Sequence, residues 1–152
     1  MASSTLLQKL DGGSDFGSTT SNRRQTEIFL ASETLLVGDA VSVDLSQTDD
    51  GDKGLYIRKA GTAAADRCFV GVVLRSVETD GTLTAESRIE VVTRGLITAN
   101  VDGSTVAGSE LVVSAVRGRL ILAVAANLYP VAAISAEAHT ANFAKVYVLS
   151  SF

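Results

Sequence analysis

The chain has 152 residues, enough for one domain with a sizeable core. Its net charge of −4 excludes the clustered lysines and arginines of a nucleic-acid-binding surface. Hydrophobic residues make up 46% of the chain but aromatic residues only 5%, so the core is expected to consist of Val, Leu, Ile and Ala. No apolar run is long enough for a signal peptide or a membrane span, and we expect a soluble protein made in the cytoplasm.

The first 27 residues differ in composition from the rest and are predicted to form a flexible N-terminal arm, followed by a single domain over residues 28–152. Residues 11–22 are nearly all Gly, Ser, Thr and Asp, which cannot bury enough apolar surface to offset their ordering entropy. Three interpretations stay open: a disordered terminus, an arm that orders on a neighbouring subunit, or an arm folded back on its own domain. In the second interpretation the apolar anchors are Leu6, Leu7, Leu10 and Phe16, and the charge contacts are Arg23 and Arg24.

The domain begins with short strand-like runs. Residues 28–30 are apolar, and residues 41–45 alternate between apolar and polar side chains, which is typical of a half-buried strand. After an Asp- and Gly-rich turn, residues 55–59 alternate again. The small-residue connection at 60–67 is expected to contain one helical turn around residues 63–65.

Further β-branched runs follow at residues 69–74, 89–97, 111–113 and 120–122, with turn-forming residues between them. Residues 123–144 are Ala-rich and fit either a strand–turn–strand unit or a short helix, while 146–149 is strand-like. The pattern predicts an all-β fold, a compact antiparallel β-barrel. Residues 70–74 and 146–149 are apolar on both faces, which indicates burial on both sides, inside the domain or against another subunit.

The sequence contains an internal pseudo-repeat. Residues 38–43 resemble residues 108–113, each with a Gly turn, a polar residue and a strand. Residues 69–74 with 89–96 likewise resemble 131–134 with 143–149, each pair forming a strand, a turn and a returning strand. Repeated hairpins of this size favour a barrel or sandwich over a solenoid.

No catalytic, cofactor-binding or metal-binding residue is predicted. The one histidine, His139, lies in a polar turn and has no nucleophile motif near it. The single cysteine, Cys68, allows neither an intramolecular disulfide nor a multi-cysteine metal site, and is expected to be a small buried residue beside Phe69. The acidic turn at 49–52 lacks the alternating ligand spacing of a calcium loop. We therefore expect no enzyme and no cofactor.

An ordered series of segments resembles the small capsid decoration, or cement, proteins of tailed bacteriophages. The segments are residues 37–41, 63–66, 69–73, 91–96 and 107–111. The resemblance covers about residues 33–152 and departs from the usual pattern at Ser109, where an acidic residue commonly follows the second Gly, and in the longer polar N-terminal extension.

The resemblance implies a β-barrel or β-tulip-like domain on the outer surface of a phage head. Such a virion protein binds the major capsid protein where subunits meet, often as a trimer, and stabilises the shell without chemistry of its own. The partners implied are the major capsid protein and further copies of the chain, with no nucleic acid and no membrane. Two alternatives stay open: another virion structural module, such as a tail-tube or head-fibre base component, or a cellular β-domain of unknown binding role.

Overall fold

The computed structural model describes residues 24–49, 52–66, 68–124, 130–139 and 142–149. These residues form an all-β fold, as the sequence predicts, with one short 3₁₀ turn. The elements are β1 (Gln25–Ala31), β2 (Ala40–Val43), β3 (Tyr56–Lys59), η1 (Ala64–Asp66), β4 (Phe69–Ser76), β5 (Arg88–Asp102), β6 (Glu110–Val113), β7 (Leu120–Leu122), β8 (Ala133–Ser135) and β9 (Phe143–Val148).

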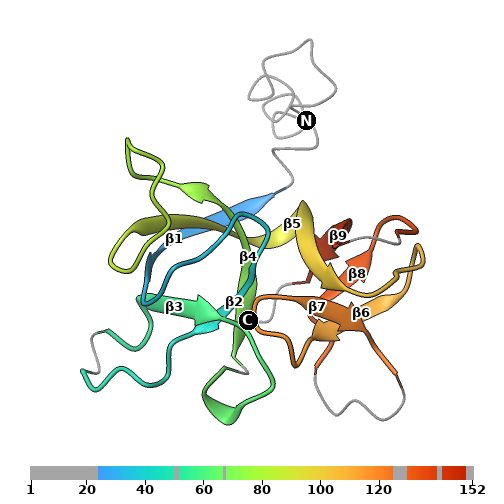
Figure 1. Cartoon of the computed structure of the whole chain (residues 1–152), viewed down its shortest axis with the longest axis horizontal. Helices are drawn as coiled ribbons and strands as arrows, with labels where there is room; N and C mark the ends of the chain where they lie inside the picture. Colours follow the sequence, from blue (N-terminus) through green and yellow to red (C-terminus); the bar gives the residue numbers. More distant parts are fainter. Residues whose placement is uncertain (1–23, 50–51, 67, 125–129, 140–141, 150–152) are drawn as a thin grey trace, which may run out of the picture.

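The strands close two rings that share one long strand. The first ring is a five-stranded barrel, formed in spatial order by β1, β3, β2, β4 and the first half of β5. The second half of β5 pairs with β7 and β9, and β6 and β8 complete the second ring. Figure 1 shows the rings side by side, with β5 crossing from one to the other. Only β1–β3 and β5–β7 pair in parallel; the other named pairs are antiparallel, as predicted.

The two rings repeat each other in strand order. In the first ring β1 pairs in parallel with β3, and in the second ring the second half of β5 pairs in parallel with β7. The antiparallel series β3–β2–β4–β5 is likewise matched by β7–β6–β8–β9. The pairing of β1 with β5 is matched by that of β5 with β9. The predicted internal repeat is therefore confirmed at the level of topology.

The repeat also holds at the level of single residues. The turn before β2 closes with a hydrogen bond from Asp39 N to the Leu36 carbonyl, and the turn before β6 closes in the same way from Ser109 N to the Val106 carbonyl, both at 3.0 Å. The preceding glycines, Gly38 and Gly108, have φ angles of 89° and 80°. A side chain is strained in this left-handed region, so glycine recurs at both turns.

Two hydrophobic cores result. One fills the first ring: Phe29, Ala31, Leu35, Val41, Ile57, Val70, Val73, Ile89 and Val91. The other fills the second ring and continues between the rings, where Ala40, Ala60, Phe69, Val72 and Val92 of the first ring join Leu111, Leu120, Ala144 and Val146 of the second. The fully buried faces of β4 thus contribute to both cores, which confirms the expected two-sided burial of this strand.

A polar clasp joins the rings at the β6–β7 turn. Gly118 accepts a hydrogen bond from Ala40 N and donates one to the Ala60 carbonyl, both at 2.8 Å. Beside it, Arg117 Nη2 lies 2.6 Å from Glu33 Oε1, and Arg117 Nε lies 3.4 Å from Asp66 Oδ2. Asp66 is buried and also pairs with Arg58 at 2.9 Å, so Arg117 shares this carboxylate and links the turn of one ring to the other.

Several boundaries differ from the sequence expectation. β1 already begins at Gln25, within the segment assigned to the arm. In the Ala-rich region 123–144 the described residues contain the strand β8 and the start of β9 and no helix, so strand–turn–strand is the better of the two interpretations there. Cys68 is partly exposed rather than buried. The predicted helical turn is present as η1.

Candidate protein-binding surface

The arm residues predicted to make contacts are almost all beyond the described part of the chain. Five of the six lie outside the described residues: Leu6, Leu7, Leu10, Phe16 and Arg23. The remaining one, Arg24, is the first described residue and is partly buried against the domain.

Arg24 lines a groove where the two rings meet. We call this the junction groove; its volume is about 290 Å³, and its lining residues are Arg24, Val37, Leu74, Leu96, Ile97, Thr98 and Lys145. The walls are mostly apolar, and among the described lining residues only Arg24 and Lys145 are charged. The arrangement suits an apolar segment that carries acidic groups or free carbonyls.

One atom of the groove lacks a partner. Arg24 Nε is buried and makes no hydrogen bond within the described part of the chain. A buried guanidinium donor without an acceptor is costly, and such groups usually face an acceptor supplied by water or by a binding partner. The described residues therefore supply no acceptor for this donor.

The internal repeat reveals a second feature, a row of side chains across the outer face of each ring. In the first ring the cross-strand pairs Ala40–Val72, Val72–Val92 and Val92–Thr26 form the row. Ala40, Val72 and Val92 are each 0% exposed, because the second ring covers them.

The corresponding row of the second ring is not covered. The register positions that correspond to the first-ring row are occupied by the pairs Glu110–Ile134, Ile134–Tyr147 and Tyr147–Leu96. Tyr147, which corresponds to the fully buried Val92, is 51% exposed. Glu110 is exposed, and Ile134 and Leu96 are partly exposed.

The uncovered row and the junction groove form one surface, because Leu96 belongs to both. The outward side chains of β9 extend it: Phe143 is 50% exposed and Leu149, just after the strand, is 37% exposed. We call the outer surface around Ile134, Tyr147 and Leu149 the second-ring face. The prediction that residues 146–149 are buried on both sides is wrong for the chain by itself, since β9 alternates between exposed and buried side chains.

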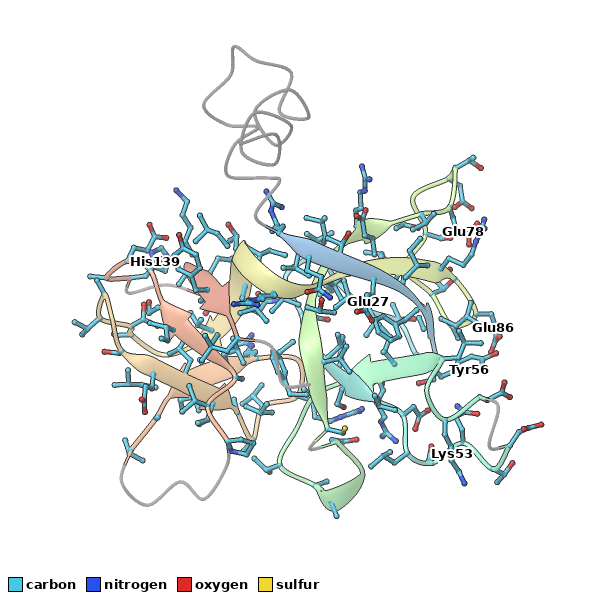
Figure 2. All side chains as sticks on the ribbon, turned by 180° about the vertical axis from the view of Figure 1, so that it is seen from behind. Glu27, Lys53, Tyr56, Glu78, Glu86 and His139 are labelled. Atoms are coloured by element: carbon cyan, nitrogen blue, oxygen red, sulfur yellow. The ribbon has the colours of Figure 1, made fainter. Side chains whose placement is uncertain are left out.

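The described histidine and the acidic side chains of the β4–β5 hairpin lie in separate parts of the molecule. His139 lies near the far end of the second ring, well apart from Glu78, Glu86 and Tyr56 at the opposite end of the molecule (Figure 2). Within the described ranges no group of three or more His, Cys, Asp or Glu side chains is arranged to hold a metal ion. None of the described residues forms a helix long and apolar enough to cross a membrane.

A second hollow lies on the β4–β5 hairpin, lined by Glu78, Thr79, Asp80, Thr82, Ala85, Glu86 and Ser87. Its acidic groups are already engaged: Glu78 pairs with Arg88 at 3.0 Å, and Glu86 accepts a 2.7 Å hydrogen bond from the Tyr56 hydroxyl. That hydrogen bond, with the neighbouring negative charge, raises the pKa of Tyr56. We interpret the hairpin as a solvated structural turn.

Comparison of the sequence with protein-family models finds no match, and comparison with curated proteins finds none. The fold defines a double-ring, all-β structural domain, and its function is argued from the surface.

Proposed function

We propose that the protein is a capsid decoration protein, a virion component that binds the outside of a phage head and bridges major capsid protein subunits. The observation that carries the proposal is the continuous apolar surface formed by the junction groove and the second-ring face. Its groove is lined in part by Arg24, one of the charge contacts predicted in the arm of residues 1–27. The resemblance of the sequence to cement proteins supports the same function.

The physical basis is avidity. A decoration protein needs complementary surface, repeated many times over a lattice, and no active site. Each copy that contacts two capsid subunits converts a second weak contact into an intramolecular one, and binding to the assembled shell alone stabilises the shell by mass action. In this proposal the arm residues Leu6, Leu7, Leu10 and Phe16 provide additional contact area, and Arg23 and Arg24 provide charge contacts.

The test is a binding assay with expanded, undecorated phage heads. Purified protein is mixed with the heads, the heads are sedimented, and the bound copies are counted. We expect saturable binding at a fixed ratio to the major capsid protein and a higher melting temperature of the heads. Formation of rings or tubes by the protein alone, without head binding, would instead support the tail-tube alternative.

A pair of variants tests the arm. Deletion of residues 2–23 leaves Arg24 and all of β1 in place, so the domain should fold and head binding should be lost. The matched control keeps the arm at full length and replaces Leu6, Leu7, Leu10 and Phe16 with serine. Loss of binding in both variants assigns the contact to the apolar anchors, whereas full binding by the deletion variant would contradict a role for the arm.

A further inference from the structure

A polar cluster lies where the two rings meet, and its side chains come from both of them. Asp39 precedes β2 of the first ring, Lys59 ends β3, and Asn100 lies in the second half of β5. The Asn100 side chain donates from Nδ2 to Asp39 Oδ1 at 2.8 Å, and Lys59 Nζ lies 3.8 Å from Asp39 Oδ2. One carboxylate therefore lies between an amine and a carboxamide.

The cluster is shielded from most of the solvent. Asp39 and Asn100 are 4% and 8% exposed, and the side chain of Lys59 is 28% exposed. Leu36 N donates to Asp39 Oδ2 at 2.9 Å, which fixes the carboxylate. Asn100 N donates to the Gly38 carbonyl at 2.7 Å, which fixes the backbone that carries the amide. Charges are costly in such a site, and transfer of a proton from an ammonium group to a carboxylate removes two of them.

Gly118 leaves room for the stem of Lys59 beside the acid. A Cβ atom at position 118 would lie 3.2 Å from both Asp39 Cγ and Asp39 Oδ1 and 3.4 Å from Lys59 Cδ. The stem of Lys59 and the oxygen that holds the Asn100 amide therefore border the same small space. Movement of Nζ along the carboxylate, from Oδ2 toward Oδ1, brings the amine toward this amide.

The internal repeat shows that the fold does not require these groups. Each member of the cluster has a counterpart in the other ring by strand register or turn position: Ser109 for Asp39, Leu122 for Lys59 and Leu30 for Asn100. None of the counterparts is a carboxylate, an amine or an amide. The same frame of strands and turns therefore forms without the cluster, which leaves its three functional groups to be explained by what they do together.

We propose that Lys59 and Asn100 form an isopeptide bond, with Asp39 as the group that carries the protons. Asp39 accepts a proton from the Lys59 ammonium group. The freed electron pair of Nζ attacks Asn100 Cγ, and the electrons of the C=O bond move onto Asn100 Oδ1. Asp39 then donates its proton to Nδ2, the C=O bond re-forms, the Cγ–Nδ2 bond breaks and ammonia leaves. A second proton from Nζ passes to the ammonia. An ammonium group and a carboxamide thus become a secondary amide and an ammonium ion, and Asp39 is unchanged.

The bond joins the two rings covalently. It connects the end of β3 in the first ring to the second half of β5, and it limits the unfolded chain as a disulfide does. Cys68 is the only cysteine of the chain, so an intramolecular disulfide cannot serve this purpose. This inference concerns the free protein and does not rest on the proposed function.

The experiment is mass spectrometry of the full chain, unfolded in denaturant, followed by peptide mapping. We expect the wild-type protein to be lighter than its sequence by one molecule of ammonia, and its digest to contain a peptide in which residues 59 and 100 are joined. Lys59→Arg keeps the cation but supplies no nucleophilic amine, and Asp39→Asn removes the proton carrier while it keeps both reacting groups. Both variants should have the full mass of their sequences. The matched control is Lys145→Arg, which changes a lysine on β9 and should still show the loss of ammonia.

The wild-type mass decides the proposal even where a variant does not fold, which circular dichroism checks. A wild-type protein with the full mass of its sequence would overturn it. Loss of ammonia without a joined peptide would also overturn it, because a cyclic imide at an asparagine has the same mass. Loss of water with residues 39 and 59 joined would assign the bond to Asp39 instead of Asn100. Loss of ammonia that persists in Asp39→Asn would contradict the role of Asp39.

Discussion

At the scale of single residues, Gly71 in β4 has less space for a side chain than any of seven other described glycines. A Cβ atom at this position would overlap the Val92 carbonyl oxygen and lie 2.8 Å from Val91 Cγ1. The Val92 carbonyl group is backbone of the long shared strand, so it cannot move without shifting β5. Gly71 is therefore required by packing rather than by its backbone angle.

Gly71→Ala is expected to lower the free energy of unfolding by about 1–3 kcal/mol, because it overpacks a filled core. Chemical denaturation monitored by circular dichroism measures the change. Gly54→Ala is the matched control, since a Cβ there has no neighbour within 4 Å, and it should leave stability unchanged within error. Equal effects of the two substitutions would contradict the steric explanation.

The carboxyl group of Asp44 makes the stability of the fold depend on pH. Burial by itself raises the pKa of this carboxyl, but hydrogen bonds outweigh it and lower the pKa far below its ordinary value. Asp44 Oδ1 accepts from Ser46 N at 3.0 Å and from the Ser46 hydroxyl at 2.6 Å, and Oδ2 accepts from Gln47 Nε2 at 2.9 Å. The folded state thus favours the ionised carboxylate.

Because the folded pKa lies below the unfolded value of about 4, ionised Asp44 stabilises the fold above about pH 4, and the contribution is lost as pH falls further. We expect Asp44→Asn to melt below the wild type at pH 7, with a difference that narrows between about pH 4 and pH 2. Melting temperatures of both proteins across this range provide the measurement. A difference that stays constant down to pH 2 would show that lost packing, not charge, explains the substitution.

At the scale of elements, β4, β6 and β7 follow directly from β-branched runs between turn residues, and their predicted and observed positions nearly coincide. β5 is longer than predicted because residues 100–103 have turn chemistry. In the structure Asn100 stays in the strand, since its N–H donates to the Gly38 carbonyl at 2.7 Å and its side chain donates to Asp39 Oδ1 at 2.8 Å. Both partners come from another part of the chain, and no local pattern reveals them.

The polar clasp between the rings is another contact that no local sequence pattern reveals. Arg117 Nη1 and Nη2 lie 3.3 Å and 2.6 Å from the two carboxylate oxygens of Glu33, a two-point geometry that only a guanidinium provides. Since the side chains of Arg117 and Glu33 are partly exposed, solvent weakens their ion pair, whereas the contact of Arg117 with Asp66 is less screened because Asp66 is buried. Asp66 also pairs with Arg58, whose Nε lies 2.9 Å from Asp66 Oδ1.

Arg117→Ala is expected to destabilise the fold by about 1–2 kcal/mol, and Arg117→Lys to recover only part of the loss. A double-mutant cycle of Arg117→Ala with Glu33→Gln, measured by chemical denaturation, isolates the exposed pair, for which we expect at most about 1 kcal/mol. A coupling energy well above this value would mean that the Glu33 contact, not Asp66, holds the turn.

At the scale of the whole molecule, the repeat and the fold class follow from the sequence, but the candidate surface does not. The second-ring face combines Glu110, Ile134, Tyr147 and Leu96, which lie on four different strands and become neighbours only through their register. One signal was available: residues 146–149 are apolar on both faces, and a single chain covers only one of them. The sequence pattern instead indicated six contact residues in the arm, and of these six only Arg24 is described.

The shared strand and shared core also determine how the molecule unfolds. β5 closes both rings, and the core of the second ring includes Phe69, Val72 and Val92 of the first. Separation of the rings would expose this core and cut β5, so neither ring is expected to be stable alone. Calorimetry should show one transition, with equal calorimetric and van't Hoff enthalpies for the protein at a fixed state of association. A fragment of residues 24–95 should show no cooperative transition. Two separated transitions, or a folded fragment, would mean that the rings are independent domains joined by a common strand.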